Sequence, residues 1–205
     1  MDSVECAKKK IRAVIAGSQV PEDPGHADNT LEWLLRLQPD AGEALQLAAL
    51  AHDIDRAIEE FKVRRADFDD YDVFKAAHAR HGAELLRPIL SACGVAADIV
   101  DETCRLLVIH EVGGDPDADL LKDADSISYF DVNLPLYFQR EGWDETKRRS
   151  LWGYRRLTPR AQQIVNHIHH EDEEVARLLQ EVVSFHNSTN ERASTKEPLW
   201  ITNLP

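Results

Sequence analysis

The sequence predicts an all-α fold in a single domain, and two observations support this prediction. Apolar residues recur along most of the chain three and four positions apart, which is the spacing of amphipathic helices. No β-branched run alternates with the period of two that strands require, and the chain has no internal repeat. A length of 205 residues is enough for one domain with a substantial core, and no shift in composition marks a second. We therefore expect a helical bundle over residues 1–185 and a polar tail over residues 186–205.

Glycine and proline divide the chain into segments of helical period, because both residues tend to end helices. The helices expected between them cover residues 3–16, 26–38, 40–53, 73–92, 95–110 and 120–130, with two or three more beyond Pro135 that include an acidic helix over residues 159–185. Residues 61–72 mix aromatic side chains with both kinds of charge and have no clean period, so we expect a loop near the site. Within the tail, we expect residues 198–201 to dock locally.

Net charge and the lack of long apolar stretches limit the classes of partner. The formal net charge of −13 opposes non-specific binding to a phosphate backbone, so we expect no nucleic-acid polymer as a partner. Residues 1–12 lack the apolar run of a signal peptide, and no stretch approaches the length of a membrane-spanning helix. We expect a cytoplasmic protein that binds a small molecule and no membrane. The sequence leaves open whether it forms a homodimer.

The three cysteines do not suggest a disulfide framework. Cys6, Cys93 and Cys104 are odd in number and have no CxxC spacing, so neither a set of disulfides nor a zinc site made of thiolates is indicated. We expect all three to be reduced structural thiols.

A His-Asp pair on an apolar helix is the first candidate for chemistry. Leu45 and Ala49 lie seven and three residues before His52, so at helical spacing this imidazole faces the core, with Asp53 beside it. An unpaired buried charge is costly, so the pair needs a partner. A divalent metal ion is one such partner. A hydrogen-bonded core histidine beside an acid at a helix end is the alternative.

Other imidazoles and carboxylates fall on inward faces of different helices. Together they form a set that could converge on one site: His26, His52, Asp53, His78, His110 and Asp125. Imidazole and carboxylate ligands suit Fe, Mn, Co, Ni or Zn, with Mg also allowed, and a carboxylate can bridge two ions. We therefore expect one or two divalent metal ions.

In the order and spacing of these residues the chain resembles the HD-domain superfamily of metal-dependent phosphohydrolases. The local contexts that carry the resemblance are Ala51-His52-Asp53-Ile54, His78 with Gly82-Ala83, Ile109-His110-Glu111 and Asp123-Ala124-Asp125. The resemblance implies an HD-type helical bundle. The two middle histidines, His78 and His110, imply its dinuclear branch, with all six residues as metal ligands and Asp53 as the bridge.

The activity implied by the resemblance is hydrolysis of a phosphate ester or anhydride by metal-activated water. The expected substrate is a small phosphorylated metabolite, such as a nucleotide or dinucleotide polyphosphate. Two alternatives stay open at this point. The same six ligands also support mixed-valent di-iron oxygenases in this superfamily, and an HD domain can serve as a catalytically idle nucleotide sensor.

Arg56 is the candidate for holding the phosphate. The family commonly has a lysine three residues after the aspartate of the pair, and here that position is Arg56. A guanidinium can hold a phosphate with two parallel hydrogen bonds, so we expect a catalytic and substrate-binding role. The alternative is a surface residue paired with Glu59 or Glu60.

Further residues have competing interpretations. His81 could replace His78 as a ligand, but we expect it to support the site or bind substrate. Asp123 competes with Asp125 in the same way. Arg80 and Lys122 are expected to add positive charge at the mouth of the site.

Two clusters farther along the chain are ambiguous. The basic and aromatic residues of segment 143–156 could grip a polyphosphate or stack a base, although a charged helix face is the favoured interpretation. Residues 167–170 contain three histidines, His167, His169 and His170, but lie on an acidic segment. We expect these histidines to be exposed to solvent.

Overall fold

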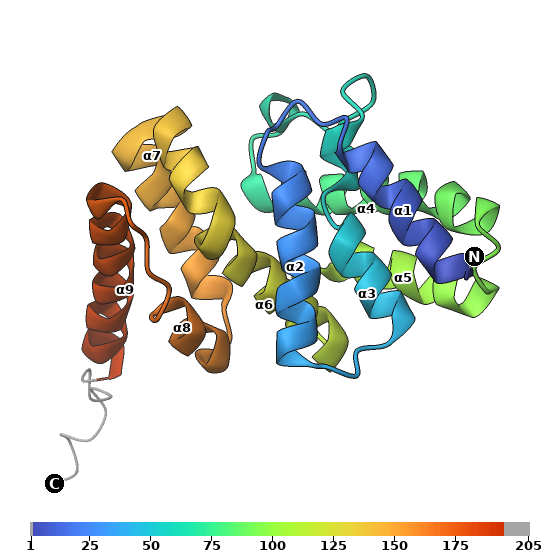
Figure 1. Ribbon diagram of the computed structural model, residues 1–205. Coiled ribbons are helices and arrows are strands. Elements are labelled where there is room, and N and C mark those ends of the chain that lie inside the picture. Colours follow the sequence, from blue (N-terminus) through green and yellow to red (C-terminus); the bar gives the residue numbers. More distant parts are fainter. Residues whose placement is uncertain (1, 195–205) are drawn as a thin grey trace, which may run out of the picture.

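The computed structural model describes residues 2–194, and within this range the regular elements are helices, with no strand (Figure 1). The expected all-α, single-domain fold is confirmed. In chain order the elements are α1 (Ser3–Ile15), α2 (Asp23–Leu37), α3 (Glu43–Ala51), the short 3₁₀ helices η1 (Ile54–Ala57) and η2 (Arg65–Asp67), α4 (Tyr71–Ala92), α5 (Ala97–Ile109), α6 (Pro116–Ser128), the π-helical turn η3 (Tyr129–Asn133), α7 (Leu134–Arg156), α8 (Pro159–Val165) and α9 (Glu173–Ser194).

Helix α6 joins two groups of helices around one contiguous apolar core. Helices α1 to α5 lie on one side of the bundle and α7 to α9 on the other (Figure 1). Helix α6 packs against α2 and α3 on one side and against α7 and α8 on the other. Helix α1 shows how the sequence pattern produces this packing, because its buried residues Val4, Ala7, Ile11 and Ile15 recur three and four positions apart.

Helix α3 ends earlier than the sequence suggests. It stops at Ala51, so His52 is its C-terminal cap and Asp53 lies beyond it in a non-helical conformation. Our placement of both residues within a helix is therefore wrong. Successive side chains of a helix point about 100° apart, and leaving the helix here lets this His-Asp pair face the same point.

The acidic helix expected over residues 159–185 is two helices. Thr158 caps α8, and Asp172 caps α9 by accepting hydrogen bonds from the backbone N–H groups of Glu174 and Val175 at 2.9 and 3.1 Å. Helix α9 continues to Ser194, past residue 185 at which the sequence predicts the start of the tail. Residues 198–201, which we expect to dock locally, lie outside the described residues.

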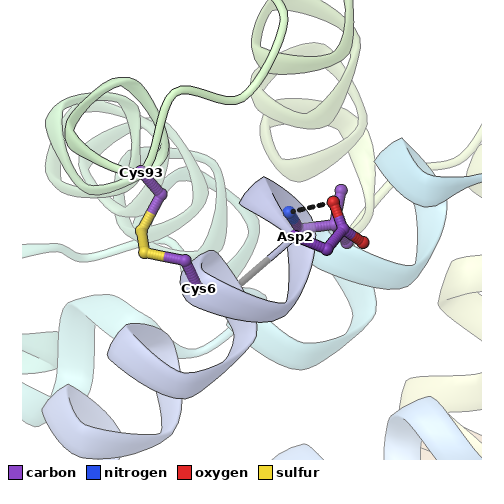
Figure 2. The surroundings of a disulfide bond; sticks show 4 residues. Asp2, Cys6 and Cys93 are labelled. Carbon is purple, nitrogen blue, oxygen red and sulfur yellow. Dashed lines mark hydrogen bonds between the residues drawn. A yellow bond between two sulfur atoms is a disulfide. The ribbon is translucent and has the colours of Figure 1, made fainter.

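A disulfide joins the first helix to the end of α4. Figure 2 shows the bond between Cys6 and Cys93, whose Cα atoms are 5.7 Å apart. The expectation of reduced thiols is wrong for these two residues, because a pairing across 87 positions leaves no signal in local cysteine spacing. Cys104 is a buried free thiol, as expected.

No helix within residues 2–194 is both long and apolar enough to cross a bilayer.

Candidate metal centre

His52 is fixed by the end of α3. Its Nδ1 lies 2.9 Å from the carbonyl oxygen of Ala49, one of the helix-end carbonyls that lack a partner within the helix. Because a carbonyl only accepts, Nδ1 carries the hydrogen and Nε2 points inward as the free ring nitrogen.

His110 repeats this arrangement at the end of α5. It is the C-terminal cap of that helix, and its Nδ1 donates to the carbonyl oxygen of Leu107 at 2.6 Å. The ring is fully buried, and its Nε2 lies 3.2 Å from the carboxylate of Glu111 without the geometry of a hydrogen bond. Burial lowers the pKa of His110, which favours the neutral ring and leaves a lone pair on Nε2.

His26 lies in the first turn of α2 and is held by α6. Its Nδ1 lies 2.8 Å from the hydroxyl oxygen of Ser128, and this hydroxyl donates to the backbone carbonyl of His26 at 3.2 Å. Nδ1 is therefore the donor, and Nε2 is again free. Burial lowers the pKa of His26 to about 4, so the ring is neutral at pH 7.

His78 is held by a carboxylate that the sequence did not reveal as functional. Its Nδ1 donates to Asp55 at 2.9 Å, while its Nε2 lies 3.0 Å from Oδ1 of Asp53. Asp55 also contacts His81 and accepts from the backbone N–H of Val63. Burial raises the pKa of Asp55, but the hydrogen bonds from the two histidines outweigh this effect and lower it overall. Carboxylates behind metal-binding imidazoles orient the ring in this way.

The free nitrogens of His26 and His52 meet at one point. Their Nε2 atoms are 3.1 Å apart and lie 3.1 and 3.5 Å from Oδ1 of Asp125. In two neutral rings these lone pairs repel each other unless a cation lies between them. Nitrogen ligands at 2.0–2.1 Å from one ion are roughly 3.0–3.4 Å apart. The distance observed fits a shared metal ion.

Asp53 lies between two parts of the cluster. Its Oδ2 is 3.2 Å from Nε2 of His52 and 3.6 Å from Nε2 of His26, while Oδ1 faces His78. One carboxylate thus offers an oxygen to each side, which is the arrangement that a bridging ligand needs.

Glu111 is a second residue that sequence reasoning did not assign to the site. Its carboxylate lies 3.2 Å from Nε2 of His110 and is paired with Lys75 and, at 2.9 Å, with Arg156. Burial raises the pKa of Glu111, but these charges outweigh burial and hold its pKa well below the usual value. The position of Glu111 directly after His110 was the available signal.

The ligand atoms group into two sets of three that could hold a metal ion. Within each set the atoms lie within 4.8 Å of one another, and Asp125 belongs to both sets. The sets are His26, His52 and Asp125, and His110, Glu111 and Asp125. Burial raises the pKa of Asp125, yet the hydrogen bonds from His26 and His52 hold it well below its usual range, so it is a carboxylate.

The neighbouring acid on α6 has a different task. Asp123 accepts hydrogen bonds from the backbone N–H, at 2.9 Å, and the hydroxyl of Thr158 at the start of α8. Two residues apart on a helix, Asp123 and Asp125 point in nearly opposite directions. The structure thus places Asp125, and not Asp123, at the cluster.

Arg56 turns toward the cluster rather than toward Glu59 or Glu60. Its guanidinium contacts the carboxylate of Asp53 and lies 3.3 Å from Asp23. About a third of the side chain (36%) is exposed, so the guanidinium is at the boundary between cluster and solvent.

The other expected substrate contacts lie farther out. Arg80 is exposed and lines a shallow groove between α4 and α5. Lys122 donates to Asp119 at 2.8 Å and to the carbonyl of Val112 at 3.3 Å. His81 supports Asp55, as described above. Roles for these three residues in substrate binding stay predictions.

The two ambiguous clusters divide into exposed and buried parts. Lys147 and Arg148 pair with surface glutamates, whereas Arg149 and Arg156 lie against Trp152. In the segment 167–170, His167 and His169 are exposed, but His170 is half-buried because its ring packs next to the backbone of Phe130. The expectation of full exposure is wrong for His170.

Comparison with known proteins gives one result. The chain matches the family model described as "Domain of unknown function (DUF4202)" over residues 6–179, which covers all the residues of the cluster. No curated protein and no solved structure matches the chain significantly.

Proposed function

The chain belongs to the family described as Domain of unknown function (DUF4202). On the geometry of the cluster, we propose that it is a metal-dependent phosphohydrolase of the HD type. One observation carries the proposal. Four buried imidazoles each donate a hydrogen bond from Nδ1 to an oxygen atom, and their free Nε2 atoms converge on the carboxylates of Asp53 and Asp125. The four residues are His26, His52, His78 and His110.

The residues present fit one or two divalent ions. His26, His52, Asp53 and Asp125 would hold the first, and His78 or Glu111 together with His110 would complete a second beside Asp53 and Asp125. Bound metal supplies Lewis acidity toward a phosphoryl oxygen and lowers the pKa of a water molecule toward neutrality. Buried, pre-oriented ligands of this kind need little rearrangement to receive an ion.

The charges around the cluster support a phosphorylated substrate. The protein as a whole carries a net charge of −13, yet four cationic side chains lie at or beside the cluster: Arg56, Lys75, Arg149 and Arg156. They lie among five carboxylates, those of Asp23, Asp53, Asp55, Glu111 and Asp125, so one or two bound divalent ions would raise the net charge above zero and favour an anionic ligand held at one place. This feature favours phosphate chemistry over the oxygenase alternative.

The direct test uses purified wild-type protein. We expect transition metal in the purified protein, and release of phosphate from a panel of nucleotides and p-nitrophenyl phosphate when Mn, Co, Ni, Fe or Mg is added separately. Oxygen consumption by the iron-loaded protein without phosphate release would contradict the proposal in favour of an oxygenase. A metal-free protein that is inert in the whole panel would contradict it as well.

Arg56 sharpens this test. Its guanidinium can leave Asp53 for a phosphoryl oxygen while staying next to the cluster, so it would stabilise charge that builds in the transition state. We expect Arg56→Ala to lower kcat/KM by roughly 10- to 1000-fold with metal content unchanged, given about 1.5–4 kcal/mol for a charged hydrogen bond. Arg56→Lys should restore part of the loss.

The matched control is Arg36→Ala, because Arg36 is an exposed arginine paired only with Glu32 on its own helix and with the face of Trp33. Full activity is expected in the control. If Arg56→Ala is equally active, Arg56 only neutralises Asp53 and Asp23.

A further inference from the structure

Helix α7 presents a stripe of cationic and aromatic side chains. Arg149, Trp152 and Arg156 are spaced three and four residues apart and therefore share one face of the helix. The guanidinium carbons of Arg149 and Arg156 lie 4.7 and 4.2 Å from the centre of the Trp152 ring. Such stacking fixes a guanidinium while leaving its N–H groups at the edge free to donate.

A cavity lies next to this stripe and adjoins the metal cluster. It has a volume of about 290 Å³ and is lined by Asp72, Lys75, Glu111, Val112, Trp152 and Arg156. Of these residues, Glu111 also belongs to the ligand set with His110 and Asp125. A group bound in the cavity would therefore be next to the cluster.

Positive charge exceeds negative charge in the inner part of this cavity. Lys75 and Arg156 share a single carboxylate, that of Glu111, while Asp72 is exposed. Arg149 does not line the cavity, but its guanidinium stacks on Trp152, which does. Among the residues that the structure describes, no carboxylate lies within 4.0 Å of its guanidinium, which instead lies against Tyr129 and Trp152.

Gly153 leaves space for the guanidinium of Arg149 beside α7. A Cβ atom at Gly153 would lie 3.3 Å from Nη1 of Arg149, so the absence of a side chain there lets the guanidinium lie close to the helix. The guanidinium of Arg149 is surrounded by aromatic faces, with Glu111 and Asp125 as more distant carboxylates, so a bound anion would be its first direct charged partner among the described residues.

We propose that Lys75, Arg149 and Arg156 form an oxyanion site over Trp152 that binds a phosphate group of the substrate beside the metal cluster. This inference rests on the proposed function and deepens it. A phosphate dianion matches the excess of charge better than a carboxylate does, and its oxygens fit the two forks of the guanidinium groups. The cavity is large enough for a phosphate group and is lined by Glu111 of the cluster, which makes the site suited to the phosphate next to the bond that is cleaved.

The test measures binding rather than activity alone. Inorganic phosphate is titrated calorimetrically into the purified protein with its metal as isolated. Arg149→Gln and Arg156→Gln should each weaken phosphate binding by about 10- to 100-fold, the range for one charge-assisted hydrogen bond. Arg149→Lys should recover part of the affinity. The matched control is Arg148→Gln, which removes an exposed arginine of the same helix paired with Glu145 and should bind phosphate like the wild type.

The outcomes separate this inference from the proposed function. Weakened phosphate binding in the variants without phosphatase activity in any protein would support the oxyanion site and count against the hydrolase. Phosphatase activity with unchanged phosphate affinity and KM in both Arg149→Gln and Arg156→Gln would overturn the oxyanion site and leave the hydrolase in place. If Arg149→Gln fails to fold, as judged by its thermal melt, the same phosphate titration is carried out with Lys75→Gln on α4. Phosphate binding should be weakened in that variant too, and unchanged binding would overturn the oxyanion site.

Discussion

Two parts of this chain are rich in histidine, but they differ in the burial of the rings and in the elements that supply them. The four histidines of the cluster come from α2, α4 and the ends of α3 and α5, and all four rings are buried. The three histidines of segment 167–170 are neighbours in sequence, and two of them are exposed. His167 even donates Nδ1 to a carbonyl, that of Gln163 at 2.7 Å, in the manner of His52 and His110.

The difference between the cluster and segment 167–170 is that only in the cluster do the Nε2 atoms, which are not used to hold the rings, converge. In the cluster, Nε2 atoms from different elements face one another and two carboxylates. Among the described residues, neither of the two candidate ligand groups includes a residue of segment 167–170. We therefore expect the cluster, where the fold brings fixed and buried rings together, and not the segment 167–170, to be the place where metal binds.

The largest expected difference between the two parts is in metal content. Asp53→Ala removes the carboxylate that faces both sides of the cluster, and we expect most of the bound metal to be lost. His169→Ala, in the exposed segment, should retain the metal content of the wild type. Elemental analysis of both purified variants decides the matter. Equal metal content in the two would mean that the cluster is not the metal site.

An intermediate effect is expected from the two middle histidines. If the cluster holds two ions, His78→Ala and His110→Ala should each lower the ratio of metal to protein by about half, leaving one ion on His26, His52, Asp53 and Asp125. The same elemental analysis measures this ratio. A full complement in both variants would show a single ion that needs neither residue.

A smaller effect should follow from the carboxylate behind His78. Asp55→Asn keeps the size of the side chain but removes the charge that orients the rings of His78 and His81, so metal affinity should fall by roughly 10- to 100-fold. Competition with a chelator measures the affinity. The matched control is Asp123→Asn, whose partner is Thr158 rather than a ring of the cluster. If both variants bind metal equally, Asp55 has only a structural role.

The smallest effect on metal is expected at the disulfide. Cys6→Ser breaks the bond to Cys93, and opening a loop of this length costs about 2–4 kcal/mol of stability. Metal content should not change, since neither cysteine belongs to the two candidate ligand groups. Thermal melts with and without reductant should show a fall in Tm for the wild type only. A wild-type Tm that is indifferent to reductant would contradict a stabilising disulfide.

Local pattern was sufficient to predict most of the helices, whereas the choice of the six residues that the fold brings together also used the resemblance to the HD-domain superfamily. The apolar stripes of α1 and α4, and the glycines and prolines between helices, depend only on near neighbours. The inward phase of His78 follows from the apolar stripe of α4, whereas the resemblance was needed to choose Asp125 over Asp123. The local sequence pattern was less informative at helix ends. Helix α3 stops at Ala51, directly before His52, and the acidic segment is divided into α8 and α9.

Features that need a distant partner could not be predicted in this way. Asp55 has its role because His78 and His81 of α4 reach it. Glu111 is held between Lys75 of α4 and Arg156 of α7. The only local signal for Glu111 is its position directly after His110, and the roles of both acids become clear only once the tertiary contacts are known.

The π-helical turn between α6 and α7 makes this point of the chain unusually tolerant of a change in length. Residues 129–133 take a wider turn than an α-helix does, with one residue more per turn. Deleting one residue there would restore α-helical pitch while keeping the downstream helix in nearly the same rotational phase, because either kind of turn closes one rotation. Leu134, which is fully buried, would then still face the core. Deleting one residue within the regular part of α7 would instead rotate everything downstream by about 100° around the helix axis.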